Sequence, residues 1–146
     1  MNFDVDQFVK IFEKSKIKGD KILFVEKMHE AIEYASQVYS FDILKDITAV
    51  DTGAGIELAY RLYSTINEEE VIFCTIVKSE MQTVTDIYKS AIADENEIYD
   101  LFGIIFIGNE DLKRLYMPED WKGYPLRKDY IEDDTRLAWN GNKNNI

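Results

Sequence analysis

The first 39 residues contain two segments with apolar residues at helical spacing, and a short hydrophobic run lies between them. Phe3, Val5 and Phe8 belong to a series that predicts an amphipathic helix over residues 4–15. Residues 21–25 contain four consecutive apolar side chains, too few for a buried helix, so they predict a strand. Residues 26–39 return to the helical period. The order that these patterns predict is helix, strand, helix.

The hydrophobic period then changes to that of β-structure. Ile47–Asp51 leads through a glycine turn into Ile56–Thr65, where apolar and polar residues alternate as on a strand with one wetter face. A charged turn at 67–70 precedes Val71–Val77, which has almost no polar break and predicts a central strand covered on both faces. We therefore expect an α+β fold in which this mostly antiparallel meander forms one sheet covered by helices.

The second half of the chain loses this regularity. Val84–Tyr88 predicts a short helical turn and Ile92–Phe102 a longer helix, whereas the glycines and prolines after Gly103 predict an extended, loop-rich arm. The final residues are rich in Asn and are expected to fray unless bound. The expected organisation is an α+β core domain at 1–80, a helical connection packed on the core at 81–102, a docking arm at 103–130 and a flexible tail at 131–146.

Composition excludes several classes of function. The net charge of −11 disfavours binding to nucleic acid and adsorption to anionic lipid, and a hydrophobic content of 46% excludes general disorder. No apolar run approaches the length of about 18 residues that spans a bilayer, so we expect no direct membrane insertion. The start lacks a signal-peptide pattern, and the single cysteine excludes an internal disulfide. These features predict a soluble, cytoplasmic protein.

Two residues could in principle support catalysis, but the pattern around each favours a structural role. Cys74 lies in the most apolar strand, where a buried thiol is inert. His29 has no second metal-ligating His or Cys nearby and is expected to face solvent on its helix. We therefore expect no catalytic, cofactor-binding or metal-binding residue in this chain.

The acidic cluster Asp94, Glu95, Glu97 and Asp100 allows three interpretations. Positions 94, 97 and 100 share one helical stripe, so their carboxylates could form a metal or acid/base site of a small carboxylate- or metal-dependent enzyme. They could also form a solvated helix face, or pair with cations further along the chain. We favour ion pairs, because carboxylates three residues apart repel unless water or cations compensate. The candidate cations are Lys113, Arg114, Arg127 and Lys128.

Residues 119–130 combine rigid aromatic area with fixed charge. Trp121 and Tyr124 supply contact area, Pro125 restricts the unfolded chain, and Gly123 permits a close approach. Arg127 can bind a carboxylate through two donors at once, and Trp, Tyr and Arg dominate protein interfaces. The segment either docks on another protein or folds back so that the tryptophan covers the chain's own sheet. Composition alone favours neither docking on another protein nor folding back on the chain's own sheet.

Five phrases in the second half of the chain form a specific pattern over about 82–130. They are Val84-Thr-Asp-Ile-Tyr88, Glu95-Asn-Glu-Ile-Tyr-Asp-Leu-Phe-Gly-Ile104, Phe106-Ile-Gly108, Asp111-Leu-Lys-Arg-Leu115 and Pro118-Glu-Asp-Trp-Lys-Gly-Tyr-Pro-Leu-Arg-Lys-Asp-Tyr130. In these phrases the chain resembles a known family, the 30 kDa subunit (also called the C subunit) of NADH:quinone oxidoreductase (respiratory complex I), which includes the related subunit of membrane-bound, energy-converting nickel–iron hydrogenases. Asn96, Asn109 and Ile131 depart from the family's usual Glu-Arg-Glu, Gly-His-Pro and final proline, which leaves open the complex that this chain serves.

The resemblance implies a subunit whose arm wraps on the large subunit of the nickel–iron hydrogenase or complex I type, next to other peripheral-arm subunits. It implies no cofactor in this chain. NADH or ferredoxin, iron–sulfur clusters, and a quinone or nickel–iron centre would belong to partner subunits. The complex would lie on the cytoplasmic, inner face of the cell membrane, and the isolated chain could form a homo-oligomer. A binding module for an unrelated partner is the remaining alternative. The expected partner-interface residues are Glu97, Asp100, Arg114, Asp120, Trp121, Gly123, Pro125, Leu126, Arg127, Lys128, Asp129 and Tyr130.

Overall fold

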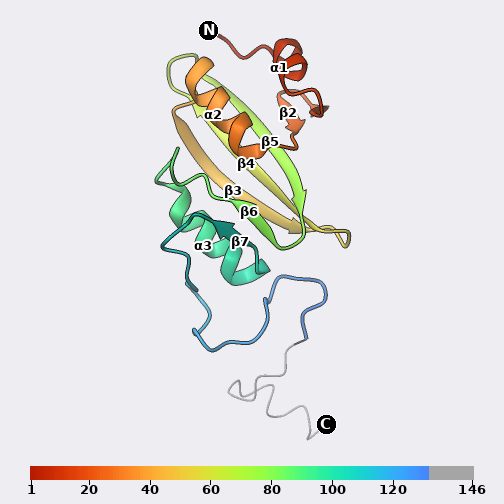
Figure 1. The fold of residues 1–146 in the computed structure, drawn as a ribbon, viewed down its shortest axis with the longest axis vertical. Coiled ribbons are helices and arrows are strands. Elements are labelled where there is room, and N and C mark those ends of the chain that lie inside the picture. The colour runs from red at the N-terminus through yellow and green to blue at the C-terminus, as the bar shows by residue number, and fades with distance from the viewer. Residues whose placement is uncertain (132–146) are drawn as a thin grey trace, which may run out of the picture.

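The computed structural model of this chain describes residues 1–131, and within them it contains three helices and seven strands (Figure 1). The expected tail at 131–146 lies, apart from its first residue, outside the described residues. In chain order the elements are α1 (Val5–Ile11), β1 (Lys16–Gly19), β2 (Ile22–Phe24), α2 (Met28–Val38), β3 (Ile43–Asp51), β4 (Ile56–Ser64), β5 (Glu69–Val77), β6 (Glu80–Gln82), α3 (Ala91–Phe102) and β7 (Ile105–Ile107).

The main sheet has five strands in the order β1-β2-β5-β4-β3. Strands β3, β4 and β5 form the predicted antiparallel meander, with Tyr60 of β4 opposite both Ile47 of β3 and Phe73 of β5. Strand β2 adds to the other side of β5 in parallel, with Leu23 opposite Phe73. Strand β5 is therefore central, and the α+β fold with a mostly antiparallel sheet is confirmed.

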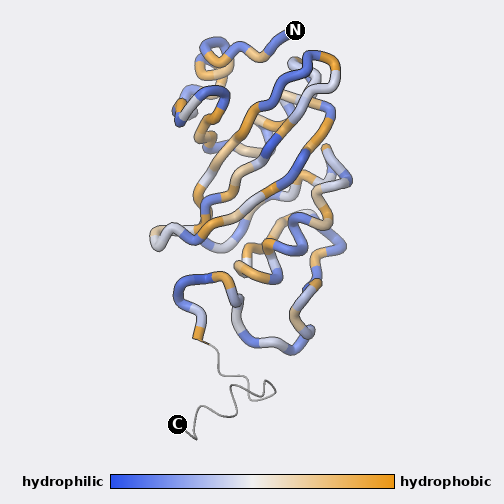
Figure 2. Tube along the Cα trace, turned by 180° about the vertical axis from the view of Figure 1, so that it is seen from behind, coloured by the Kyte–Doolittle hydropathy of each residue, from blue (hydrophilic) through white to orange (hydrophobic). Residues whose placement is uncertain are grey.

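The helices cover one face of this sheet and bury a single hydrophobic core. Leu58, Tyr60 and Leu62 of β4 are fully buried beneath them, and Ile98 of α3 belongs to the same core cluster as the sheet. Figure 2 shows the molecule from behind, where β3, β4 and β5 lie open without a helix over them. The prediction that β5 is covered on both faces is wrong, because Ile76 on its other face is 50% exposed.

Short elements account for the other differences from the sequence-based expectation. Helix α1 ends at Ile11, not at residue 15, because the chain turns at Phe12 toward a strand that the pattern did not reveal. That strand, β1, pairs antiparallel with β2 through a bulge and carries lysines on the edge of the sheet. Strands β6 and β7 form a separate parallel pair of three residues each, too short for a periodic signal.

Helix α3 packs along β3, the other edge of the main sheet. Burial against this edge raises the pKa of Asp94 in α3, and the nearby backbone of Ile47 in β3 opposes the shift. Lysines and a bulge at β1, and α3 at β3, are devices that keep sheet edges from pairing with other chains. No helix among the described residues is long and apolar enough to cross a membrane.

Candidate functional site

Asp100 on α3 holds the beginning of the loop that follows β7. Its side chain is fully buried, and one carboxylate oxygen accepts hydrogen bonds from the backbone N–H groups of Leu115 (3.2 Å), Tyr116 (2.7 Å) and Met117 (3.1 Å). The other oxygen pairs with Arg114 at 3.2 Å. Burial acts to raise the pKa of this carboxyl, but these donors together outweigh burial and hold the pKa below its usual value.

Arg114 closes the loop on itself. Its guanidinium donates to the backbone carbonyls of Asp100 (2.9 Å), Trp121 (2.9 Å) and Gly123 (3.0 Å), and lies 4.8 Å from the centre of the Tyr124 ring. Only 9% of the side chain is exposed. A planar group with five fixed donors suits this task, since the four acceptors that Arg114 binds outnumber the three N–H donors of a lysine.

Arg127 fastens the far end of the arm to the same helix. Its Nε donates to the carbonyl of Phe102 at 2.6 Å, and one terminal nitrogen donates to the carbonyl of Lys78 at 2.9 Å. The backbone N–H of Leu126 donates to the carbonyl of Leu101. A cation that binds the last carbonyls of a helix is favoured by the helix dipole. We call Asp100, Arg114 and Arg127 the clasp.

Glycine at the end of α3 leaves the space in which the arm closes. Gly103 has φ of +76°, and a Cβ added there would lie 2.5 Å from the ring of Tyr124. Gly123, with φ of +83°, packs in the same way under the ring of Tyr130. The left-handed conformation and the close ring both favour glycine at these positions.

Asp51 ties the arm to the turn between β3 and β4. Its carboxylate accepts the backbone N–H groups of Lys128 and Gly53, each at 2.8 Å. The hydrogen bond from Lys128 is the main cause that lowers the pKa of Asp51, and the bond from Gly53 adds to it. The arm therefore contacts both α3 and the main sheet of its own chain.

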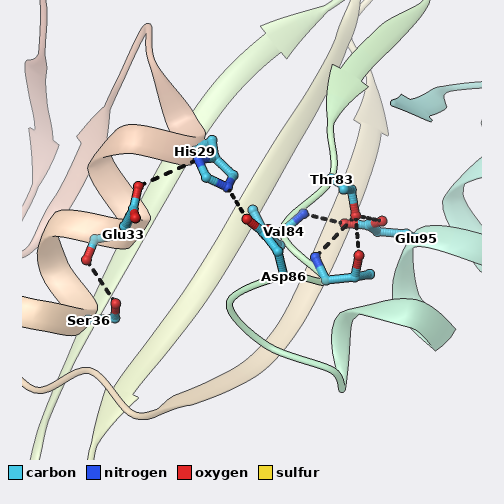
Figure 3. Close-up of polar contacts among 8 residues, drawn as sticks. His29, Glu33, Ser36, Thr83, Val84, Asp86 and Glu95 are labelled. Carbon is cyan, nitrogen blue, oxygen red and sulfur yellow. Dashed lines mark hydrogen bonds and ion pairs between the residues drawn. The ribbon is translucent and has the colours of Figure 1, made fainter. Parts of the chain in front are cut away.

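A second buried carboxylate, Glu95, joins α3 to two other segments, and Figure 3 shows its contacts with the one around Val84. It accepts hydrogen bonds from the hydroxyl of Thr83 (2.6 Å), the backbone N–H of Val84 (2.9 Å) and the side-chain amide of Asn109 (3.0 Å). Burial raises the pKa of Glu95, although these three donors oppose the shift. None of the three donors carries a charge, in contrast to the arginine that pairs with Asp100.

His29 connects the segment around Val84 to α2, as Figure 3 shows. Its Nε2 lies 2.8 Å from the carboxylate of Asp86, and its Nδ1 lies 3.9 Å from that of Glu33. The side chain is only 13% exposed, so the expectation of a solvent-facing histidine is wrong. The predicted helical turn at 84–88 is present, with the N–H groups of Ile87 and Tyr88 bonded to the carbonyl of Val84.

The acidic cluster does not converge on one point. Asp94 contacts the edge of β3, Glu97 is exposed, and Asp100 faces the arm, so the predicted common stripe has three different surroundings. Of the predicted ion pairs, Asp100 with Arg114 is present. Residues 1–131 contain no group of three or more His, Cys, Asp or Glu side chains that could hold a metal ion. Cys74 is buried, as expected, and burial raises the pKa of its thiol.

The predicted partner-interface residues differ in how far they are buried. Asp100 and Trp121 are buried within the described chain and the side chain of Arg114 is only 9% exposed, so these side chains attach the arm and do not form its outer surface. The sequence did not single out Leu115 or Tyr116, which are exposed; large apolar residues in a polar loop were the available signal. Pro125, Arg127 and Tyr130 are half-buried, whereas Glu97, Asp120, Gly123, Leu126, Lys128 and Asp129 are exposed.

Comparison with known proteins places this arrangement in a family. Residues 24–136 match the family model described as "Respiratory-chain NADH dehydrogenase, 30 Kd subunit". The C subunit of NADH-quinone oxidoreductase from Trichlorobacter lovleyi is 36% identical over 129 residues, which cover 82% of this chain and 80% of that protein. The C/D subunit of the same enzyme from Phocaeicola vulgatus is 41% identical over 112 residues, 73% of this chain. The chain spans only 22% of the length of that relative and 24% of the C/D protein of Bacteroides fragilis.

A solved structure agrees with these relatives. A chain in the "Structure of the membrane-bound sulfane sulfur reductase (MBS), an archaeal respiratory membrane complex" superposes with a TM-score of 0.73 and 28% sequence identity. The similarity covers 97% of this chain and 89% of that one, which includes the main sheet and its helices. The chain therefore belongs to the family of the 30 kDa subunit of respiratory-chain NADH dehydrogenase.

Proposed function

We propose that this chain is a cofactor-free peripheral subunit that braces the nickel–iron-hydrogenase-like large subunit of a complex I-type NADH:quinone oxidoreductase. The arm at 103–130 makes the contact. The observation that carries the proposal is the clasp, which fixes an otherwise irregular segment at both ends on α3. A loop ordered before binding loses less conformational entropy on association, so it is suited to bind another protein.

The relatives support proximity to a large partner. In the relatives named as C/D subunits, the region similar to this chain is about a quarter or less of a longer polypeptide. Two parts of one polypeptide remain close to each other in space. The remainder of such a protein is therefore our candidate for the class of surface that this chain contacts.

The redox groups belong, in this proposal, to the partner subunits. NADH or ferredoxin, iron–sulfur clusters, and the quinone or nickel–iron centre are bound there. The titratable side chains of the candidate site support the assignment, because Glu95, Asp100 and His29 each have internal partners that hold segments together. Electron transfer would be a property of the assembled complex, on the cytoplasmic face of the cell membrane.

An equivalent subunit of a membrane-bound, hydrogenase-like complex is the second candidate. The similarity to a chain of the archaeal sulfane sulfur reductase over nearly the whole length favours it. This chain has the same bracing role in both candidates, which differ only in the reaction that the complex catalyses. NADH oxidation by the purified complex, compared with ferredoxin oxidation, distinguishes them.

Co-expression with the tagged large subunit from the same organism tests the bracing role. We expect the full chain to co-elute with it in equal amounts, and Arg127→Ala or Trp121→Ala to reduce the recovered fraction because the arm loses its attachment. Separate elution of the unmodified chain would contradict the proposal. Elemental analysis of the purified chain alone checks the cofactor assignment, which a stoichiometric metal would overturn.

A further inference from the structure

Exposed apolar side chains are concentrated in the arm. Thirteen large hydrophobic residues are exposed among residues 1–131, and five of them lie in the 28 positions from 103 to 130. Tyr116 is 67% exposed, Leu126 is 53% exposed and Leu115 is 44% exposed, all in loops without a strand or helix. Exposed apolar surface gathered in one segment commonly marks a binding site. The other two are Ile105 and Ile107 of β7.

The arm also differs from the rest of the chain in charge. Residues 1–102 carry ten Lys or Arg against twenty Asp or Glu, whereas residues 103–130 carry five of each. The net negative charge of residues 1–102 repels an acidic partner and attracts cations. Residues 103–130 have no net charge and therefore do neither. The arm, which has no net charge and exposes large apolar side chains, is therefore the part of the described chain best suited to an apolar partner surface.

The clasp determines which side of the arm is available. Asp100 binds the backbone N–H groups of Leu115 and Tyr116, while the side chains of both residues remain exposed. The backbone N–H of Leu126 is bound to α3 in the same manner, and its side chain is also exposed. At Leu115, Tyr116 and Leu126, therefore, the backbone N–H group binds α3 while the apolar side chain is exposed.

Building on the proposed function, we propose that Leu115, Tyr116 and Leu126 are the residues that bind the large subunit, in an apolar depression on its surface. The charged and aromatic residues of the motif, Arg114 and Trp121 above all, are positioning residues that present them. The assignment made from the sequence, in which the arginines and the tryptophan contact the partner directly, includes Leu126 but neither Leu115 nor Tyr116. Interfaces depend on a few desolvated side chains surrounded by residues that contribute little.

Affinity measurements with the purified large subunit test this division. We expect Tyr116→Ala and Leu126→Ala each to weaken binding about tenfold or more, with thermal stability and amide exchange of the arm unchanged. Ile66→Ala is the matched control, because Ile66 is 73% exposed in the turn between β4 and β5 and should bind as the unmodified chain does.

Arg114→Ala separates positioning from contact. It should weaken binding and also speed amide exchange at residues 115–126, which Tyr116→Ala does not do. Unchanged affinity of both Tyr116→Ala and Leu126→Ala would overturn this inference while the bracing role stands. No binding by the unmodified chain would overturn both proposals.

Discussion

At the scale of residues, α3 carries two buried carboxylates in opposite electrostatic situations. Asp100 has an arginine and three backbone donors, which lower its pKa against the effect of burial. Glu95 has hydrogen-bond donors of no net charge, and burial raises its pKa. The surroundings of Asp100 therefore favour its ionised form, whereas those of Glu95 favour its protonated form. The two attach different segments to the same helix, so they can be separated by experiment.

Replacing Asp100 by Asn should strongly destabilise the chain. The change leaves Arg114 buried without its anion, and breaking a buried pair on one side costs roughly 3–5 kcal/mol. The midpoint of urea unfolding measures the loss. Glu97→Gln on the exposed face of α3 is the control and should shift unfolding by no more than about 0.5 kcal/mol. Equal midpoints for the two variants would contradict the role of Asp100.

The sign of the pH dependence follows for Asp100 from its lowered pKa. Ionised Asp100 stabilises the folded chain at pH values above the ordinary Asp pKa of 3.8. This stabilisation is lost as the pH falls through the lower pKa that Asp100 has in the folded state. In acid titrations of unfolding free energy, the difference between the unmodified chain and Asp100→Asn should therefore shrink below that range. A difference that stays constant with pH would indicate another cause.

Glu95 should show the reverse dependence. Because its pKa in the folded state is raised, its contribution is most favourable below the ordinary Glu value of 4.5 and is lost as pH rises through the higher folded value. Glu95→Gln keeps a carbonyl acceptor and removes the titration. We expect its unfolding free energy to vary less with pH, from the ordinary Glu value up to neutrality, than that of the unmodified chain. Chemical denaturation across this range measures it, with Glu97→Gln as the control.

At the scale of elements, α3 organises the second half of the chain. Its N-terminal half covers the β3 edge, Glu95 in its middle joins the loops at 83 and 109, and its C-terminal end receives both arginines of the arm. The helix ends at Gly103, where the left-handed conformation and the ring of Tyr124 meet. A change at this glycine should therefore affect the helix end and the arm together.

Two glycines allow that coupling to be isolated. Gly103→Ala and Gly53→Ala both place a side chain at positive φ, +76° and +86°, which costs about 1–2 kcal/mol. Only at position 103 does the new Cβ meet a ring, because nothing lies within 4 Å of the Cβ at position 53. We expect Gly103→Ala to lower the melting temperature further and to increase amide exchange in the arm. Identical behaviour of the two variants would show that Tyr124 moves aside freely.

At the scale of the whole molecule, the chain separates a strongly acidic core from a neutral arm. Both edges of the main sheet are protected, by lysines and a bulge at β1 and by α3 at β3. Addition of a strand from another protein is therefore disfavoured at either edge. Association through the arm requires neither edge of the sheet.

Binding of the large subunit should consequently depend little on salt. Screening acts on charges, and salt at ~0.1 M already limits their range to about 10 Å. We expect the dissociation constant to change by less than about threefold between ~0.1 and ~0.5 M sodium chloride, because apolar contacts dominate. Isothermal titration at several salt concentrations measures this. A steep loss of affinity with salt would show that the contact uses charges of the core instead.

The sequence predicted the parts of the fold that have long periodic patterns. The meander from Ile47 onward and the helix ending at Phe102 are confirmed, since burial of alternate or helically spaced residues leaves a direct signal. Strand β1 could not be found, because an edge strand of Lys-Ile-Lys-Gly has no apolar face to mark it. The sequence likewise did not predict that Arg114 points inward. An arginine that binds carbonyls of its own chain has the same sequence signal as one that binds another protein.

Cys74 gives this chain a built-in reporter of opening. The single sulfhydryl is 3% exposed in the central strand, on the other face of that strand from Phe73, so a chromogenic thiol reagent reaches it only when the groups around it move apart. Its rate of labelling therefore measures opening around the central strand without any introduced probe. Assembly with a large partner through the arm leaves the open face of the sheet accessible to the reagent, and any slowing of the reaction would record stabilisation transmitted to the core.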